Sequence, residues 1–199
     1  GDVGDYQISV SGIAATNYAF TYQTGTLTVV PKEITVTITP GGGTYLGSIT
    51  PASAVFSGLI DGHGADPVIT YSGVANDGVS YEGQPTHAGN YTVTVAPSTG
   101  NYSLTGTVTA SFIINKKEVT EPQQPTSRDY NGRTQTSGLL DTADYTVNDP
   151  GQKDAGTYDV ECSLRDPNNY KWTSTDEQTL LVPMTINKIP VTAVPYVWA

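Results

Sequence analysis

Three heptapeptides of this chain align residue for residue, and this internal repeat limits the fold more than any other feature of the sequence. Gly4, Gly89 and Gly156 open the segments GDYQISV, GNYTVTV and GTYDVEC. Apolar side chains occupy every second position in all three, as in a β-strand with one buried face. Copies separated by the length of a small domain predict tandem β modules, because solenoid repeats have shorter periods.

A tyrosine stands two residues after each of these glycines. We predict a turn with positive φ at the glycine and a hydrogen bond from each tyrosine hydroxyl to the backbone of that turn. The arrangement is similar to the tyrosine corner of immunoglobulin-like sandwiches. The predicted structural residues are Tyr6, Tyr91 and Tyr158. We expect Tyr91 and Tyr158 to be largely buried.

The same series of features follows each heptapeptide. An Asn-Tyr pair comes first, at 17–18, 101–102 and 169–170. A short apolar strand ending at a basic junction comes next, in LTVVPK, FIINKK and MTINK. These junctions predict the closing hairpin of a truncated module at 1–31, complete modules at 32–116 and 117–188, and the opening strand of a further module at 189–199.

Short strands and turns account for the interior of each predicted module. Val, Ile, Thr and Tyr are frequent, and these residues suit a pleated surface. The patterns predict strands at 33–39 and 67–73, a turn at the glycines 41–43, and a hairpin turn at Asn-Asp-Gly 76–78. No segment has a capped helical period. The expected fold is all-β, in tandem immunoglobulin-like β-sandwich modules, with β-grasp-like modules as the alternative.

Cys162 is the only cysteine of the chain, so it cannot form a disulfide within it. It stands where the other two copies have Val10 and Val95. We therefore expect a small, buried, apolar residue. A nucleophilic role is disfavoured, because no neighbouring histidine or helix terminus is present to lower the thiol pKa.

The net charge of −10 argues against two classes of partner. Nucleic acids and anionic membrane surfaces both require a basic footprint. No apolar run approaches the ~20 residues that cross a bilayer, so we expect no direct membrane insertion.

Catalytic, metal and cofactor sites lack a recognisable pattern in this sequence. His63 and His87 are the only histidines, and neither has metal-ligand spacing. The loop DGHGAD at 61–66 could hold a cation, but it lacks the sixth and twelfth positions of a calcium loop. Carboxylate pairs such as Asp141 with Asp144 suit turns as well as acid–base chemistry. We expect a non-enzymatic protein with no cofactor and no metal.

Aromatic residues could provide a sugar-stacking platform, or they could pack within the modules. The weak ligand candidates are Tyr45, Tyr71, Tyr81 and Trp172, together with Tyr130 and Tyr145. The sequence does not identify a partner, and a glycan or a host or cell-surface protein are the options.

Four segments carry a resemblance to the MBG and YDG repeats of bacterial cell-surface proteins and to related bacterial immunoglobulin-like modules. They are AGNYTVTV, NYSLTG with ASFIINK, DYNGRTQTSGLLDTADYTV, and AGTYDVECSLRDPNNYKW with MTINK. The resemblance implies an extracellular, cell-surface anchored protein, often called an adhesin, whose modules form a stalk. It brings no catalytic residues to this chain. A glycan- or protein-binding module, or an accessory region of a secreted polysaccharide-degrading enzyme, are the alternatives.

The segment 1–31 has an apolar face that needs cover. This face comprises Tyr6, Ile8, Val10, Leu27 and Val29, and a lone hairpin is only marginally stable in water. We expect it either to pack against the first complete module or to pair head-to-tail with 189–199 of a neighbouring molecule.

Overall fold

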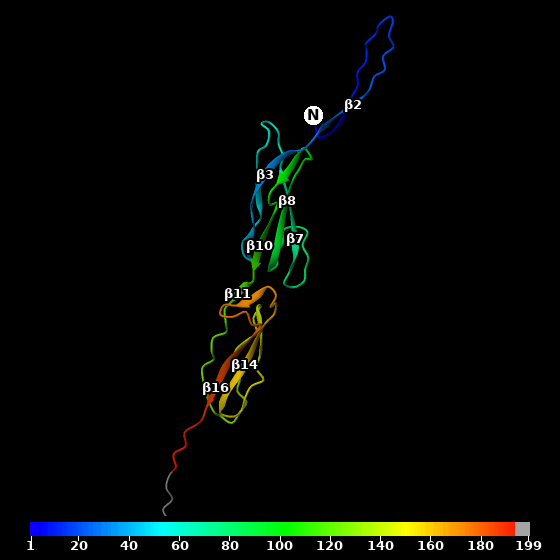
Figure 1. The fold of residues 1–199 in the computed structure, drawn as a ribbon. Coiled ribbons are helices and arrows are strands. Elements are labelled where there is room, and N and C mark those ends of the chain that lie inside the picture. The colour runs from blue at the N-terminus through cyan, green and yellow to red at the C-terminus, as the bar shows by residue number, and fades with distance from the viewer. Residues whose placement is uncertain (194–199) are drawn as a thin grey trace, which may run out of the picture. The chain divides into compact units, whose positions relative to one another are not determined.

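The computed structural model describes residues 1–193, and all regular secondary structure among them is β (Figure 1). This confirms the all-β prediction. A β-grasp module carries a helix on its sheet, and the described residues contain none. The chain divides into two compact units. The first comprises Gly1–Gly43, Ile49–Pro85 and Asn90–Ile113, and the second Thr44–Ser48, Thr86–Gly89 and the chain from Ile114 onward.

The first unit begins with a hairpin of strands β1 (Gly4–Ile8) and β2 (Gly25–Val29). The strands are antiparallel, with Tyr6 opposite Leu27. The apolar face that was expected to be covered is largely exposed: Tyr6 is 41% exposed, Ile8 50% and Leu27 52%. The proposed pairing with 189–199 includes residues 194–199, which lie outside the described residues.

Two further sheets complete the first unit. One has the order β6-β3-β9, from Ser53–Ser57, Lys32–Thr39 and Tyr102–Thr105. The other has the order β5-β4-β10-β8-β7, from Ile49–Thr50, Gly42–Thr44, Thr109–Asn115, Gly89–Pro97 and Pro67–Ala75. The predicted alternation is clear in β8, where Tyr91, Val93 and Val95 are at most 2% exposed.

The run of three glycines is not the predicted turn. Gly42 and Gly43 belong to β4 and pair with β5. A Cβ at Gly41 would clash with the carbonyl oxygen of Thr50. The glycines therefore allow a close approach of two backbones, as glycine in a strand often does. The predicted hairpin turn at 76–78 does form, since the Ala75 amide donates to the Val79 carbonyl at 2.8 Å.

The second unit also contains two sheets. A parallel pair joins β11 (Lys117–Val119) to β15 (Tyr170–Trp172). A four-stranded sheet has the order β12-β16-β14-β13, from Arg128–Asp129, Thr179–Asn187, Gly156–Leu164 and Tyr145–Asn148. Val119 and Trp172 of the first sheet share a core with Cys162 and Val182 of the second. This shared core makes the unit a β-sandwich type fold.

Candidate functional site

The corners at Tyr6 and Tyr158 have the predicted hydrogen bond from the tyrosine hydroxyl to the backbone. The Tyr6 hydroxyl donates to the carbonyl oxygen of Asp2 at 2.6 Å, and the Tyr158 hydroxyl donates to that of Asp154 at 3.0 Å. Each bond joins residues four positions apart at the start of a strand. The corner thus fixes how the chain enters β1 and β14.

The predicted positive φ is found at one of the three corner glycines. Gly4 has a φ of 151°, whereas Gly89 and Gly156 do not have a positive φ. A Cβ at Gly156 would lie 3.2 Å from the Tyr158 hydroxyl oxygen. The glycine is therefore explained by the space that the tyrosine ring occupies, because that contact is tighter than a side chain normally accepts.

Tyr91 is the most deeply buried of the three corner tyrosines, at 1% exposure. Its ring lies 5.9 Å from Tyr81 in an edge-to-face arrangement and 5.5 Å from Phe112. Burial, followed by the charges of Tyr81 and Asp77, raises the pKa of Tyr91 to about 12. Tyr158 is only half-buried, where it packs against the cluster of Val160, Met184 and Ile186, so the largely buried position predicted for it is not found.

The Asn of the Asn-Tyr pair contacts the corner of the preceding repeat copy. In the first unit the Asn101 side-chain oxygen accepts a hydrogen bond from the Val3 amide at 2.9 Å. In the second unit the Asn169 side-chain oxygen accepts one from the Ala88 amide at 2.8 Å. Val3 and Ala88 occupy the same place in the repeat, immediately before the corner glycine.

The amide nitrogen of each of these asparagines is also engaged. Asn101 donates to the carboxylate of Asp2 at 2.9 Å, and Asn169 donates to that of Asp166 at 3.0 Å. The second copy has His87 where the first has Asp2, so the acceptor comes from the turn that carries Asn169 itself. Asn169 is only 2% exposed, and buried polar groups of this kind are normally hydrogen-bonded.

The backbone of the same asparagines holds the first residue of each module. The Lys32 amide donates to the Asn101 carbonyl at 3.0 Å, and the Lys117 amide donates to the Asn169 carbonyl at 2.9 Å. The parallel strands that follow have the same register, with Lys32 opposite Tyr102 and Lys117 opposite Tyr170. One asparagine therefore joins three points of the chain, and it does so twice.

Trp172 is removed from the ligand candidates by its burial. Its exposure is 0%, and it packs in the core with Val119 and Cys162. Tyr145 covers it at a ring distance of 5.4 Å. A stacking ligand needs an accessible ring face, and Trp172 offers none.

The remaining aromatic candidates have neighbours within their own unit. The Tyr71 hydroxyl accepts a hydrogen bond from the Ala52 amide, and its ring is edge-on to Phe112. Tyr81 contacts Tyr91, and Tyr130 packs on the core of the second unit. We find no shared aromatic platform among these described side chains.

Tyr45 belongs to a small aromatic group in the second unit. Its ring is edge-to-face with His87 and with Tyr170, each at 5.6 Å. The Lys117 ammonium lies 5.5 Å from the centre of the Tyr170 ring, a distance typical of cation–π contacts. Two members of this group are sequence neighbours of the hydrogen bond from Ala88 to Asn169, because His87 precedes Ala88 and Tyr170 follows Asn169.

A cavity of about 410 Å³ lies in the second unit beside Leu139, Val147 and Asp149. The Asp149 carboxylate accepts hydrogen bonds from the Ser137 hydroxyl and amide at 2.6 Å, and from Gly151. Burial alone would raise the pKa of Asp149, but these hydrogen bonds outweigh it and lower the pKa. The Asp149 carboxylate therefore holds the segments of Ser137 and Gly151 together.

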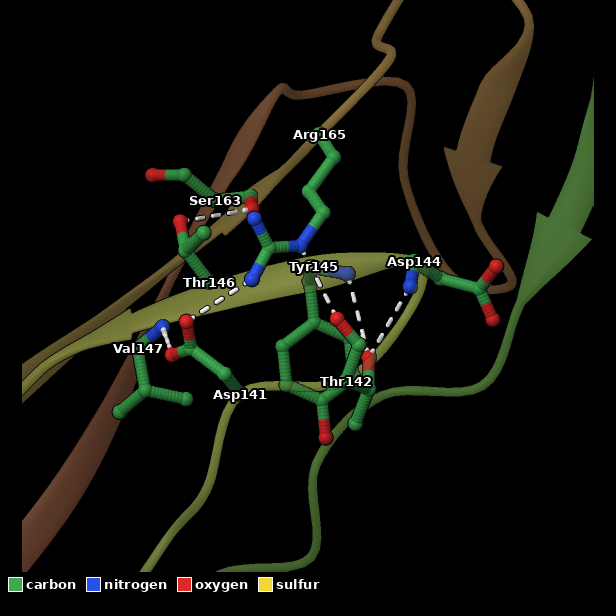
Figure 2. Close-up of polar contacts among 8 residues, drawn as sticks. All are labelled: Asp141, Thr142, Asp144, Tyr145, Thr146, Val147, Ser163 and Arg165. Atoms are coloured by element: carbon green, nitrogen blue, oxygen red, sulfur yellow. Dashed lines mark hydrogen bonds and ion pairs between the residues drawn. The ribbon is translucent and has the colours of Figure 1, made fainter.

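The predicted carboxylate pair Asp141 and Asp144 lies in a polar network around a tight turn (Figure 2). Asp141 accepts hydrogen bonds from the Val147 amide and from Arg165, both at 2.8 Å. Arg165 also donates to the Thr142 carbonyl at 2.9 Å. In Figure 2 the Asp144 carboxylate points away from this group. The Asp141 carboxylate therefore holds the turn, whereas Asp144 contributes through its backbone amide, which donates to the Thr142 hydroxyl at 3.2 Å.

The loop 61–66 was considered as a cation site. The His63 amide donates to the Ile60 carbonyl, and the Asp66 amide donates to the Ser98 hydroxyl. Across the described residues, no group of three or more His, Cys, Asp or Glu side chains is placed to hold a metal ion. The described residues also include no helix long and apolar enough to span a membrane.

Sequence reasoning noticed the Asn-Tyr pairs but missed the role of Asn101 and Asn169. It also missed Arg165, which bonds Asp141 and the Thr142 carbonyl in a turn of the second unit. The available signal was the recurrence of Asn before Tyr at the same place in all three copies. A repeated amide side chain indicates a hydrogen-bonding requirement.

One family shows similarity to part of this chain. Residues 1–28 match the family model of the MBG domain (YGX type). This match covers the β1–β2 hairpin and its first corner, and it relates that part of the chain to surface-associated repeat domains. No curated protein and no solved structure matches the chain.

Proposed function

We propose that this chain is a non-enzymatic structural repeat region of a bacterial surface protein. Its task is to space and carry other parts of that protein outside the cell. The residues that recur in every copy then hold the chain together mechanically and do not catalyse a reaction.

The observation that supports this role most directly is the repeated asparagine contact. Asn101 and Asn169 each bond the corner of the preceding copy and the first residue of their own module. Within each unit these hydrogen bonds tie the start of a corner to the turn that opens the parallel ladder. Their recurrence at the same repeat position in both units supports a structural role for the asparagine.

The chemistry of the described side chains supports a structural role as well. Three polar side chains accept hydrogen bonds from the backbone of neighbouring segments, namely those of Asp141, Asp149 and Tyr71. Cys162 is fully buried, and burial, followed by the charge of Asp149, raises the pKa of its thiol. A buried thiol with a raised pKa is a poor nucleophile.

The likeness of residues 1–28 to surface-associated repeats supports the proposed extracellular location. A chain without an intrachain disulfide is compatible with export, and its net charge of −10 keeps it soluble. Antibodies raised against the chain should label intact cells that produce it. Labelling only after permeabilisation would contradict the location.

Single-molecule stretching of the full chain between its two ends tests the structural role. We expect two discrete unfolding events, each releasing on the order of 200–300 Å of chain at ~3.4 Å per residue. Smooth extension without such events would contradict the proposal. Saturable binding of a glycan, or hydrolysis of one, would instead favour the binding or enzymatic alternatives.

A further inference from the structure

The asparagine joint has three parts that recur together. The Asn side-chain oxygen accepts from the corner amide, the Asn carbonyl accepts from the first residue of the module, and the next strand pairs in parallel. Val3, Asn101 and Lys32 make one joint, and Ala88, Asn169 and Lys117 make the other. The joint is therefore a property of the repeat.

A third set of the same positions is present near the end of the described chain. The strand register places Gly4 opposite Val29 and Gly156 opposite Ile186. Counting three residues onward from Val29 reaches Lys32, and from Ile186 it reaches Ile189. Ala155, immediately before Gly156, is thus the third corner residue, and 189–191 is the third opening segment.

This third set differs from the first two in burial. Ile34 and Val119, each two residues after the start of a module, are 2% and 5% exposed. Val191 stands at the same place and is 90% exposed, and Ile189 is 53% exposed. Among the described residues, no asparagine side chain bonds the Ala155 amide. The third set therefore has the corner amide and the opening segment, and the described residues supply no asparagine side chain to bond the corner.

We propose that Ala155 and the segment 189–191 form the docking end for a further repeat of this same type, which carries an Asn-Tyr turn. Its asparagine side chain accepts from the Ala155 amide, and its asparagine carbonyl accepts from the Ile189 amide. The strand after that turn pairs in parallel with 189–191 and buries Val191. This inference rests on the proposed structural role of the repeats.

Pro190 fits this geometry. It occupies the place of Glu33 and Glu118, between the first and third residues of the opening strand. In the second unit the ladder uses the Lys117 amide and the Val119 carbonyl. Alternate residues make the bonds of a parallel ladder, so the amide at the intervening place points away. A proline there removes no ladder hydrogen bond.

Lys188 supplies a further parallel. It precedes Ile189 as Lys116 precedes Lys117. The Lys116 ammonium donates to the carbonyl of Pro167, at 2.7 Å, in the turn that carries Asn169. The same reach from Lys188 would meet the turn of a docked repeat. A docked repeat is therefore recognised by its hydrogen bonds to Ala155 and Lys188 as well as by the burial of Val191.

An extended chain tests this proposal. Residues 1–193 are kept as they are and continued by a second copy of 122–188, so that 189–193 replaces 117–121 as the opening strand of the appended repeat. Amide hydrogen exchange is measured at Ala155, with Ala88 in the same sample as the internal reference. We expect exchange at Ala155 to slow at least ten-fold relative to the present chain.

Two variants of the appended copy complete the experiment. Asn169→Ala in that copy should restore fast exchange at Ala155, whereas Asn169→Asp, which keeps an acceptor oxygen, should preserve the protection. Unchanged exchange at Ala155 beside a folded appended copy would overturn the proposal. So would an appended copy that does not fold on 189–193, or protection that persists with Asn169→Ala. Loss of protection at Ala88 itself would count against the proposed function too.

Discussion

The Asn169 side-chain oxygen accepts a hydrogen bond from the Ala88 amide across 81 positions of sequence. Ala88 is fully buried, and Asn169 is 2% exposed. A buried amide without a partner carries a desolvation cost of about 1–3 kcal/mol. The hydrogen bond to Asn169 therefore offsets the desolvation cost that the buried Ala88 amide would otherwise carry.

Tyr91 and Tyr6 form a matched pair for testing the corner. They occupy the same place in the repeat, but Tyr91 is 1% exposed and Tyr6 is 41% exposed. We expect Tyr91→Ala to lower the free energy of unfolding by about 3–5 kcal/mol, because a large cavity opens. Tyr6→Ala should cost much less. Equal losses in urea unfolding would show that burial does not distinguish the two copies.

Cys162 should be replaceable by valine. The sister strands carry Val10 and Val95 at this place, and a hydrophobic exchange of similar volume usually costs less than ~1.5 kcal/mol. We expect Cys162→Val to unfold at nearly the wild-type urea concentration. We also expect the native thiol to react slowly with a thiol reagent at neutral pH. Labelling as fast as in the unfolded chain would refute its burial.

Alkaline pH should destabilise the protein through Tyr91. Its pKa is raised to about 12 in the folded chain, whereas an unfolded tyrosine ionises near 10. The native state thus holds the proton more tightly, so the stabilisation is complete below pH 10 and is lost as the pH rises towards 12. Urea unfolding across this range should show a steep fall for the wild type and a shallower one for Tyr91→Phe. The same pH dependence of stability in the wild type and in Tyr91→Phe would show that Tyr91 does not cause the alkaline destabilisation.

The turn in Figure 2 predicts an unequal effect of two substitutions at Asp141. Asp141 and Arg165 are both substantially exposed, and such ion pairs contribute about 0–1 kcal/mol. Asp141→Asn keeps an acceptor for the Val147 amide and should cost at most that amount. Asp141→Ala removes both interactions and should cost more. Chemical unfolding that ranks the variants in reverse order would contradict the assignment.

Strand alternation and the fold class could be predicted because both depend on local pattern. Tyr91, Val93 and Val95 are buried on one face of β8, and Cys162 is buried in β14. Period-two burial needs only the strand itself. The hairpin turn at 76–78 was predictable for the same reason, since its signal is contained in three consecutive residues.

Features that depend on distant segments were not predictable from one sequence. The burial of Trp172 requires knowing that β15 lies over β14. The glycines 41–43 are explained by the backbone of Thr50, not by a turn. The motif of Tyr6 and Tyr91 is the same, yet one is exposed, because burial depends on the surrounding sheets. The partners of Asn101 and Asn169 lie far away along the chain.

Amide hydrogen exchange at Ala88 in the full chain tests the central claim most directly. The Asn169→Ala variant is compared with Asn168→Ala, the same substitution at the exposed neighbouring position. We predict that Asn169→Ala speeds exchange at Ala88 at least ten-fold and lowers the free energy of unfolding by about 1–3 kcal/mol, while Asn168→Ala leaves the protection of Ala88 intact. An Ala88 amide that stays equally protected in Asn169→Ala would contradict the joint between successive repeats.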